Sequence, residues 1–201
     1  MNLLVLGITN IMSNYTVIGD VGESLKKLLE EDAWTGITPK PKITFKSPKE
    51  IKDDGGNANN EISLFLYQVL ENPFHKNDEL QRVGNSRLHF PPLGLDLFYL
   101  ITPYHDDKTQ EKVILGKVMQ IFHDTVILNG SILQGALKGT DEEIKILVNP
   151  ITLDDLTKIW SAFQEVAYRL SLSYLVTPVS LESTREVGIQ RVRNVKRLVT
   201  G

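Results

Sequence analysis

The chain has 201 residues, enough for one sizeable core, and 41% hydrophobic with 23% charged residues is usual for a globular protein. A net charge of −3 argues against binding nucleic acid over the whole surface, because proteins that do so are usually strongly basic. The absence of cysteine excludes disulfides, thiolate nucleophiles and cysteine-based zinc sites.

The opening sequence MNLLVLGITNIM is apolar, but it lacks the basic leading region and the small-residue cleavage site of a signal peptide. Nowhere does an apolar run approach the ~18 residues of a membrane-spanning helix. We therefore expect a soluble chain that is made in the cytoplasm and binds no membrane.

The first predicted element is an amphipathic helix after Ser13, a residue that can cap it. Its apolar residues recur at helical spacing: Ile18, Val21, Leu25, Leu28 and Leu29. Residues 19–24 superficially resemble a phosphate-binding loop, but no convincing strand precedes them and the apolar period continues through them. We expect a helix whose two glycines allow close packing. A short strand at 43–45 and a polar, mobile loop at 53–60 should follow.

Two long strands are predicted at 62–70 and 93–101, because both are apolar on both alternating faces, as in a sheet covered on two sides. The connection between them, 72–90, is long and polar, and connections of this length in a compact domain tend to be functional or disordered. Its cations make it a candidate interface loop: Lys76, Arg82 and Arg87.

A second helix is predicted at 108–123, with Gly116 allowing close approach to a neighbour, and a strand at 144–148. Thr152, with Asp155 three residues later, begins a third helix whose apolar stripe continues to Ala167. A strand at 170–176 should be separated by Pro178 from a last one at 179–181.

This order of elements favours an α+β fold, a single domain with a mixed β-sheet and about three helices packed on it. It does not favour a parallel sheet built from regular βαβ units. We expect that domain to span residues 1–184 and a basic C-terminal arm to span 185–201.

Catalytic and metal-binding groups are scarce. The four histidines lack helical ligand spacing and a completing carboxylate, so surface or loop positions are expected: His75, His89, His105 and His123. The pair Asp106 and Asp107 suits a turn before the second helix, and Asp154 and Asp155 suit a first helical turn, where they meet the positive end of the dipole. We expect no enzyme, no metal and no cofactor.

The arm is basic although the whole chain is acidic. It holds one acid, Glu186, and five cations: Arg185, Arg191, Arg193, Lys196 and Arg197. One reading is a solvated, frayed terminus. The other is an arm that docks on a partner by adding a strand to an exposed sheet edge, steered by its charge.

Three segments carry a family resemblance: ISLFLYQVLENPFHKN (62–77), PPLGLDLFYLITPYHDDKTQEKVILGKVMQIFHDTVIL (91–128) and LDDLTKIWSAFQEVAYRLSLSYLVTPVSLEST (153–184). In these segments the chain resembles the tube-terminator, or cap, proteins of extracellular contractile injection systems of the antifeeding-prophage type. The first twelve residues and the tail after Thr184 are less typical.

The resemblance implies a structural role in a phage-tail-like particle that is assembled in bacteria and can be released from them. A homohexameric ring would close the baseplate-distal end of the inner tube and engage the sheath. Its partners would be its own copies, tube subunits and sheath subunits. Two alternatives stay open: a baseplate or tube-initiating component of the same particle, and a small ligand-binding domain or enzyme with a pocket at the sheet edge.

Overall fold

The structure is a computed structural model that describes residues 15–54, 60–75, 79–83 and 87–188, with residues 81–83 described by their backbone alone. The helices are α1 (Val17–Glu31), α2 (Pro48–Asp53), α3 (Lys108–Asp124) and α4 (Leu153–Ser161). The strands are β1 (Lys42–Thr44), β2 (Glu61–Glu71), β3 (Gln81–Val83), β4 (Arg87–His89), β5 (Leu93–Tyr104), β6 (Ile127–Leu128), β7 (Ile144–Val148), β8 (Leu172–Leu181) and β9 (Glu186–Gly188). Two 3₁₀ turns, Gly130–Ile132 and Gly135–Leu137, follow β6.

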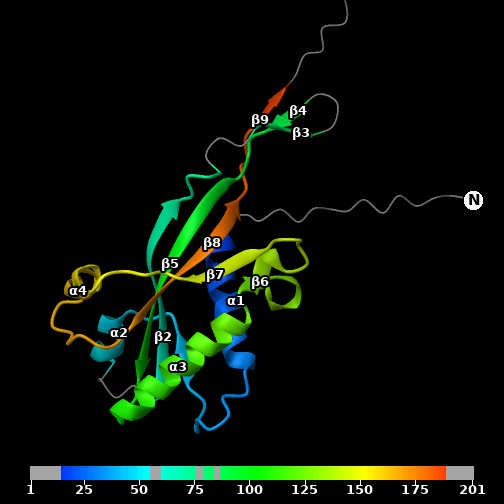
Figure 1. The fold of residues 1–201 in the computed structure, drawn as a ribbon. Helices are drawn as coiled ribbons and strands as arrows, with labels where there is room; N and C mark the ends of the chain where they lie inside the picture. Colours follow the sequence, from blue (N-terminus) through cyan, green and yellow to red (C-terminus); the bar gives the residue numbers. More distant parts are fainter. Residues whose placement is uncertain (1–14, 55–59, 76–78, 84–86, 189–201) are drawn as a thin grey trace, which may run out of the picture.

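The main sheet has six strands in the order β1-β2-β5-β8-β7-β6. β1 lies parallel to β2, whereas β2, β5, β8, β7 and β6 pair antiparallel, so the sheet is mixed as predicted. A second sheet, in the order β3-β4-β9, projects from the end of β2 and β8 (Figure 1). The fold is an α+β single domain, as the sequence indicated.

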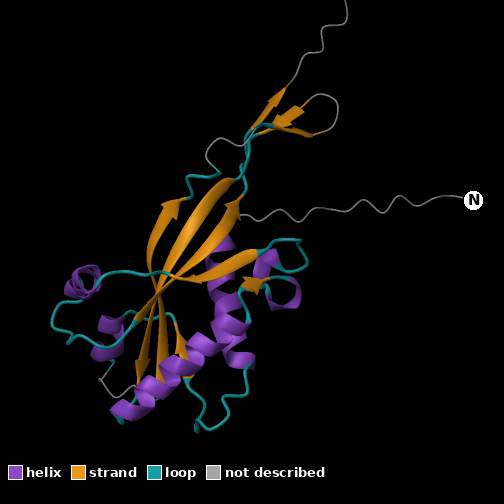
Figure 2. Ribbon diagram, in the orientation of Figure 1, coloured by secondary structure: helices purple, strands orange, loops and turns teal. Residues whose placement is uncertain are grey.

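Helices cover both faces of the main sheet (Figure 2). α1 and α3 pack on one face, where the larger core forms around Val21, Leu25, Ile114 and Val118. α4 packs on the other face, where Leu156 and other apolar side chains form a smaller core with Leu100, Trp160 and Phe163. β5 is buried between these two layers, which is why its sequence is apolar at successive positions.

α1 is amphipathic along the predicted stripe. Val21, Leu25 and Leu29 are buried, and Ile18 and Leu28 are partly buried against the same core. Ser13, the predicted cap, lies outside the described residues, and Thr16 occupies the N-cap position of the observed helix. The polar loop at 53–60 is likewise mostly outside them.

Of the three glycines predicted to allow close packing, Gly22 does so, whereas a Cβ at Gly19 or Gly116 would meet no neighbouring heavy atom within 4 Å. A Cβ at Gly22 would lie 3.3 Å from Phe45 Cε1 and 3.5 Å from the Tyr99 hydroxyl. A Cβ at Gly116 would have no heavy atom within 4 Å outside its own turn, because this residue is on the exposed side of α3. The predictions for Gly19 and Gly116 were therefore wrong.

The acidic pairs serve helix starts. Asp107 is the N-cap of α3 and accepts a hydrogen bond from the Thr109 amide at 2.7 Å. Thr152 caps α4 by accepting from the Asp155 amide at 3.1 Å, and its hydroxyl donates to the Asp155 carboxylate at 2.7 Å.

α4 ends at Ser161, six residues before the predicted limit at Ala167. The chain continues through tight turns, in which the Phe163 amide donates to the Trp160 carbonyl at 3.0 Å. These turns place the Phe163 ring edge-on to Phe65 at 5.6 Å between ring centroids. The apolar stripe was correctly assigned to a core, but tertiary packing rather than helical continuation satisfies its second half.

Pro178 does not divide the last strand as predicted. β8 continues through it to Leu181, and the register against β5 shifts between the pairs Leu97–Val176 and Leu95–Val179. The register shift lies at Pro178, which has no amide hydrogen to donate to the neighbouring strand. The proline is therefore accommodated by a bulge, and the strand does not end there. The two strands predicted at 170–176 and 179–181 are therefore one.

The predicted connection at 72–90 also contains strands. β3 and β4 form an antiparallel pair inside it, and β9 adds to β4 from the C-terminal side. Three-residue strands give too short an alternation to be recognised in sequence, and pairing across about 100 positions is a tertiary event.

We expect Gly22→Leu to lower the free energy of unfolding by about 1–3 kcal/mol, because the added side chain meets Phe45 and Tyr99. Gly116→Leu is the matched control and should raise it by about 0.5–1 kcal/mol, since leucine is the better helix former. Urea titrations of both variants measure this. Equal losses in both would show that Gly22 is not at a close contact.

We expect Thr152→Ala to cost about 1 kcal/mol of stability through the lost cap, whereas Thr152→Ser should retain most of it. The Thr152 hydroxyl is the main cause that lowers the pKa of Asp155 in the folded state. Because the pKa of this carboxyl is lower in the folded than in the unfolded chain, its ionised form stabilises the fold at pH values above the unfolded-state pKa of about 3.9. This stabilisation is lost as the pH falls through the folded-state pKa. The difference in stability between the parent and Thr152→Ala should therefore become smaller below about pH 4. Thermal unfolding of both proteins at several pH values measures this.

Candidate assembly interface

The predicted interface loop and the predicted basic arm meet in the small sheet. β4 pairs with β3 on one side and with β9 on the other, with Leu88 opposite Val187. The Phe90 amide extends this contact by donating to the Arg185 carbonyl at 3.1 Å. Two regions that the sequence suggested separately, the loop and the start of the arm, thus form one small sheet.

The described cations of this unit make local contacts. Arg87 pairs with the Glu186 carboxylate at 3.1 Å, and the Arg185 guanidinium lies over the Phe90 ring at 4.2 Å from its centroid. Both contacts cross between the loop and the arm, so they stabilise the β4–β9 pairing. Arg82 lies in β3 with its side chain outside the described part, and the remaining predicted positions are outside it altogether: Lys76, Arg191, Arg193, Lys196 and Arg197.

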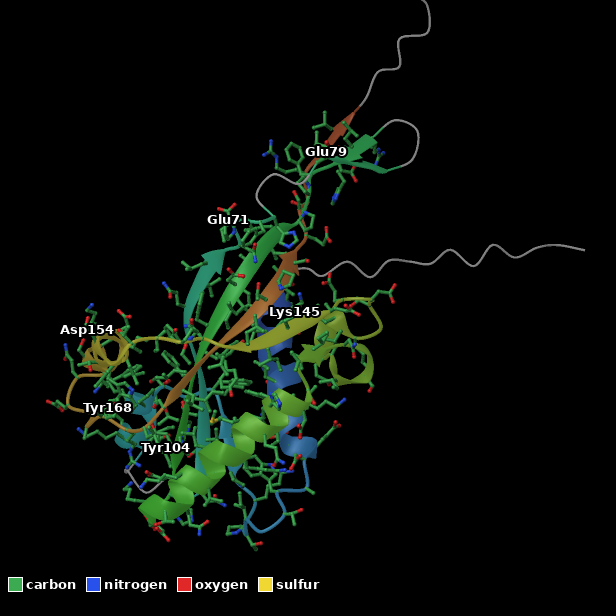
Figure 3. The ribbon with its side chains drawn as sticks, in the orientation of Figure 1. Glu71, Glu79, Tyr104, Lys145, Asp154 and Tyr168 are labelled. Carbon is green, nitrogen blue, oxygen red and sulfur yellow. The ribbon has the colours of Figure 1, made fainter. Side chains whose placement is uncertain are left out.

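Exposed apolar side chains gather where the main sheet gives way to the small one, a region we call the projecting end. It comprises the last residues of β2 with the turn after them, the start of β5 and the β3-β4-β9 sheet. In Figure 3, Glu71 marks the end of β2 and Glu79 the approach to β3. The exposed apolar residues there are Val69, Leu70, Phe74, Leu80, Leu93 and Val187. Apolar groups concentrated in one region are typical of an interaction surface.

Phe74 is the most exposed of them, with 89% of its surface accessible. Its position is fixed by Asn72, a buried residue whose side-chain oxygen accepts from the Phe74 amide at 2.9 Å. The Asn72 side-chain amide donates to Asp96 at 2.8 Å and to Thr177 at 3.1 Å, both beside the bulge between β5 and β8. The turn therefore presents an aromatic ring to solvent from a rigid base, as a binding anchor requires.

Sequence reasoning missed this role of Asn72 and Phe74. The signal was present, because Asn-Pro dipeptides commonly initiate turns and Asn72 precedes Pro73. Only the neighbouring strands show that the amide is buried and the ring is not.

Two partly buried carboxylates lie where β8 leaves the main sheet. Burial raises the pKa of Glu142, and the nearby charge of Glu182 raises it further. Burial also raises the pKa of Glu182, while His89 opposes this shift. The base of the projecting end therefore carries acidic groups in an environment that disfavours their charge.

A second apolar region lies between the end of α3 and the outer side of β7. It borders a depression of about 480 Å³ lined in part by Phe122, Ile146 and Tyr174. Four exposed side chains surround it: Met119, Val126, Leu147 and Val148. Lys145 in Figure 3 lies on the same strand.

Within the described residues, no group of three or more histidine, aspartate or glutamate side chains is arranged to hold a metal ion. The four histidines lie in four different places: after β2, in β4, after β5 and near the end of α3. In that same part of the chain, no helix has both the length and the apolar character needed to cross a membrane.

The fold is similar to two solved structures of contractile injection particles. One is the sheath/tube terminator of the extracellular contractile injection system PVC in its extended state, with a TM-score of 0.66 at 21% identity over 94% of this chain and 65% of that one. The other is the tube-terminating cap of the anti-feeding prophage, with a TM-score of 0.58 at 21% identity over 95% of this chain and 63% of that one. The chain thus spans less than two thirds of the length of either structure.

A search of curated protein sequences finds no match to this chain. The family model described as the Pvc16 N-terminal domain matches residues 20–194, which include α1 from Asp20 onward and every later element described. The chain therefore belongs to the Pvc16 N-terminal domain family.

Proposed function

We propose that this chain is a structural cap, or tail terminator, that forms a hexameric ring on the baseplate-distal end of the inner tube and engages the surrounding sheath. The observation that carries the proposal is the family match over residues 20–194, joined to a fold shared with two terminators over 94% and 95% of the chain. The role is structural and requires no chemical reaction.

The physical task of a terminator is to match one face of a growing tube and to offer no copy of it on the other side. Each added ring otherwise regenerates the adhesive surface on which the next ring assembles. Six copies multiply each contact, so modest buried area per subunit suffices for a stable cap. A rigid sheet with exposed apolar side chains at one end suits such a contact.

Within this proposal, the projecting end is the docking surface. Phe74 supplies a large apolar area that loses little conformational freedom on binding, because Asn72 already holds its backbone. The small sheet places Leu80 and Val187 in the same region. These residues are exposed in the isolated chain, so their burial becomes available as binding free energy.

A deletion of the gene tests the capping role. Without the cap, particles should have broad or aberrant tube lengths or should disassemble from the baseplate-distal end. Length distributions from electron micrographs of the deletion strain and of the complemented strain measure this.

Uniform, normally ended particles in the deletion strain would refute the terminator role. A bulky label on the chain provides the second readout and should lie at the end away from the baseplate. A label at the baseplate would favour a baseplate or tube-initiating component instead.

Phe74→Ser should leave the free energy of unfolding within about 0.5 kcal/mol of the parent, because the ring is 89% exposed. It should weaken co-assembly with tube or sheath subunits about 30-fold, the factor that the loss of about 2 kcal/mol at a central anchor implies. Leu153→Ser is the matched control, since Leu153 is 71% exposed in a different region, at the start of α4. Co-sedimentation with purified subunits measures both, and an equal response would contradict docking by the projecting end.

A further inference from the structure

A groove between α1 and the main sheet is not used by the proposed docking surface. It has a volume of about 640 Å³ and is lined by apolar groups of three elements, including Ile18, Phe45, Leu64 and Leu66. The Tyr99 side chain forms part of its floor, and burial raises the pKa of its hydroxyl. The groove is open because Gly22 has no side chain at this point on α1.

The groove runs beside an uncovered edge of the main sheet. β1 pairs with β2 over the three positions Glu61, Ile62 and Ser63. Beyond Ser63, no described strand lies on that side of β2. The register against β5 shifts at Tyr67, so Leu64–Leu66 forms a regular stretch of edge between the end of β1 and this bulge. An added strand can pair with such an edge while its alternate side chains enter the groove.

The rim of the groove carries more negative than positive charge. Asp20 and Glu23 line it from α1. Asp20 also accepts from the Ala136 amide at 3.1 Å. The nearby cation is Lys26, which lies over the Phe45 ring and forms a 4.0 Å ion pair with Glu23. An occupant that combines apolar and basic residues therefore complements both the floor and the rim.

Residues 189–201 of this chain have that chemistry. They contain no acid, four basic residues and five large aliphatic ones, namely Arg191, Arg193, Lys196 and Arg197 with Ile189, Val192, Val195, Leu198 and Val199. An extended segment of this length reaches roughly 40 Å. β9, which leads into it, runs away from the main sheet (Figure 1), so a neighbouring copy is the natural recipient.

We propose that residues 189–201 of one copy add as a strand beside Leu64–Leu66 of a neighbouring copy, with aliphatic side chains in the groove and basic ones toward Asp20 and Glu23. This inference rests on the self-association in the proposed function, and it names the surfaces that join adjacent subunits. Such a head-to-tail contact uses two different patches on each subunit, as a closed ring requires.

Single-cysteine variants test the pairing directly, because the chain has no cysteine of its own. Gln68→Cys, exposed on β2 just past the bulge, is placed in a copy lengthened by a tag, and Val195→Cys in an untagged copy. Mild oxidation of the mixture should give a disulfide-linked species of the summed mass. Lys145→Cys, exposed on β7, replaces Gln68→Cys in the control and should give little of it.

Charge reversal provides a second test. Glu23→Lys at the rim should weaken self-association by about threefold or more, as the loss of an ion pair implies, and the parent interaction should weaken with salt. Glu30→Lys makes the same charge change near the C-terminal end of α1, away from the groove, and should have little effect on self-association. Light scattering of both variants and of a chain truncated after Gly188 measures this, with circular dichroism as the test of folding.

The outcomes separate this inference from the capping proposal. A parent chain that stays monomeric even with tube subunits contradicts the proposed self-association itself. Rings that persist in the truncated chain, or equal cross-linking with Lys145→Cys, overturn the strand addition and leave the ring intact. Cross-linking of Val195→Cys to sheath subunits in place of a second copy also overturns it.

Discussion

The burial of β5 on both faces is the constraint on which the rest of the structure depends. β5 pairs with β2 and β8 along most of its length, and its side chains enter both cores, Leu97 and Ile101 on one face and Leu100 on the other. A strand with two apolar faces must be covered twice. α1 and α3 therefore occupy one face and α4 the other, and the small β3-β4-β9 sheet lies outside these layers.

The irregularity between β5 and β8 links this core to the projecting end. Asp96 lies at the register shift, and its carboxylate accepts hydrogen bonds from Asn72 and from the Thr177 hydroxyl. The bulge therefore anchors the turn that presents Phe74, through the hydrogen bonds from Asn72 to Asp96 and Thr177.

The exposed apolar groups of the described residues lie in several separate regions of the surface. The groove beside β2 and the depression beside β7 lie toward opposite edges of the main sheet, and the projecting end lies at the end of its strands. Open edges invite pairing with other chains, and the bulge at Tyr67 limits the regular edge of β2 to a short stretch. In the strand addition that we propose, a short edge next to an acidic rim would select its partner by charge as well as by backbone pairing.

Local patterns in the sequence were sufficient to place α1, α3, β7 and the two long strands to within a few residues, because amphipathic periods and continuous apolar runs report burial directly. The caps at Asp107 and Thr152 were equally predictable, since the chemistry of a helix start is contained within four residues. What required the tertiary structure was every feature that joins distant positions. The early end of α4 follows from Phe163 packing on Phe65, and the unbroken β8 follows from a bulge opposite Pro178. The pairing of β4 with β9 and the burial of Asn72 beneath an exposed Phe74 are likewise invisible in sequence, because they depend on which surfaces the sheet brings together.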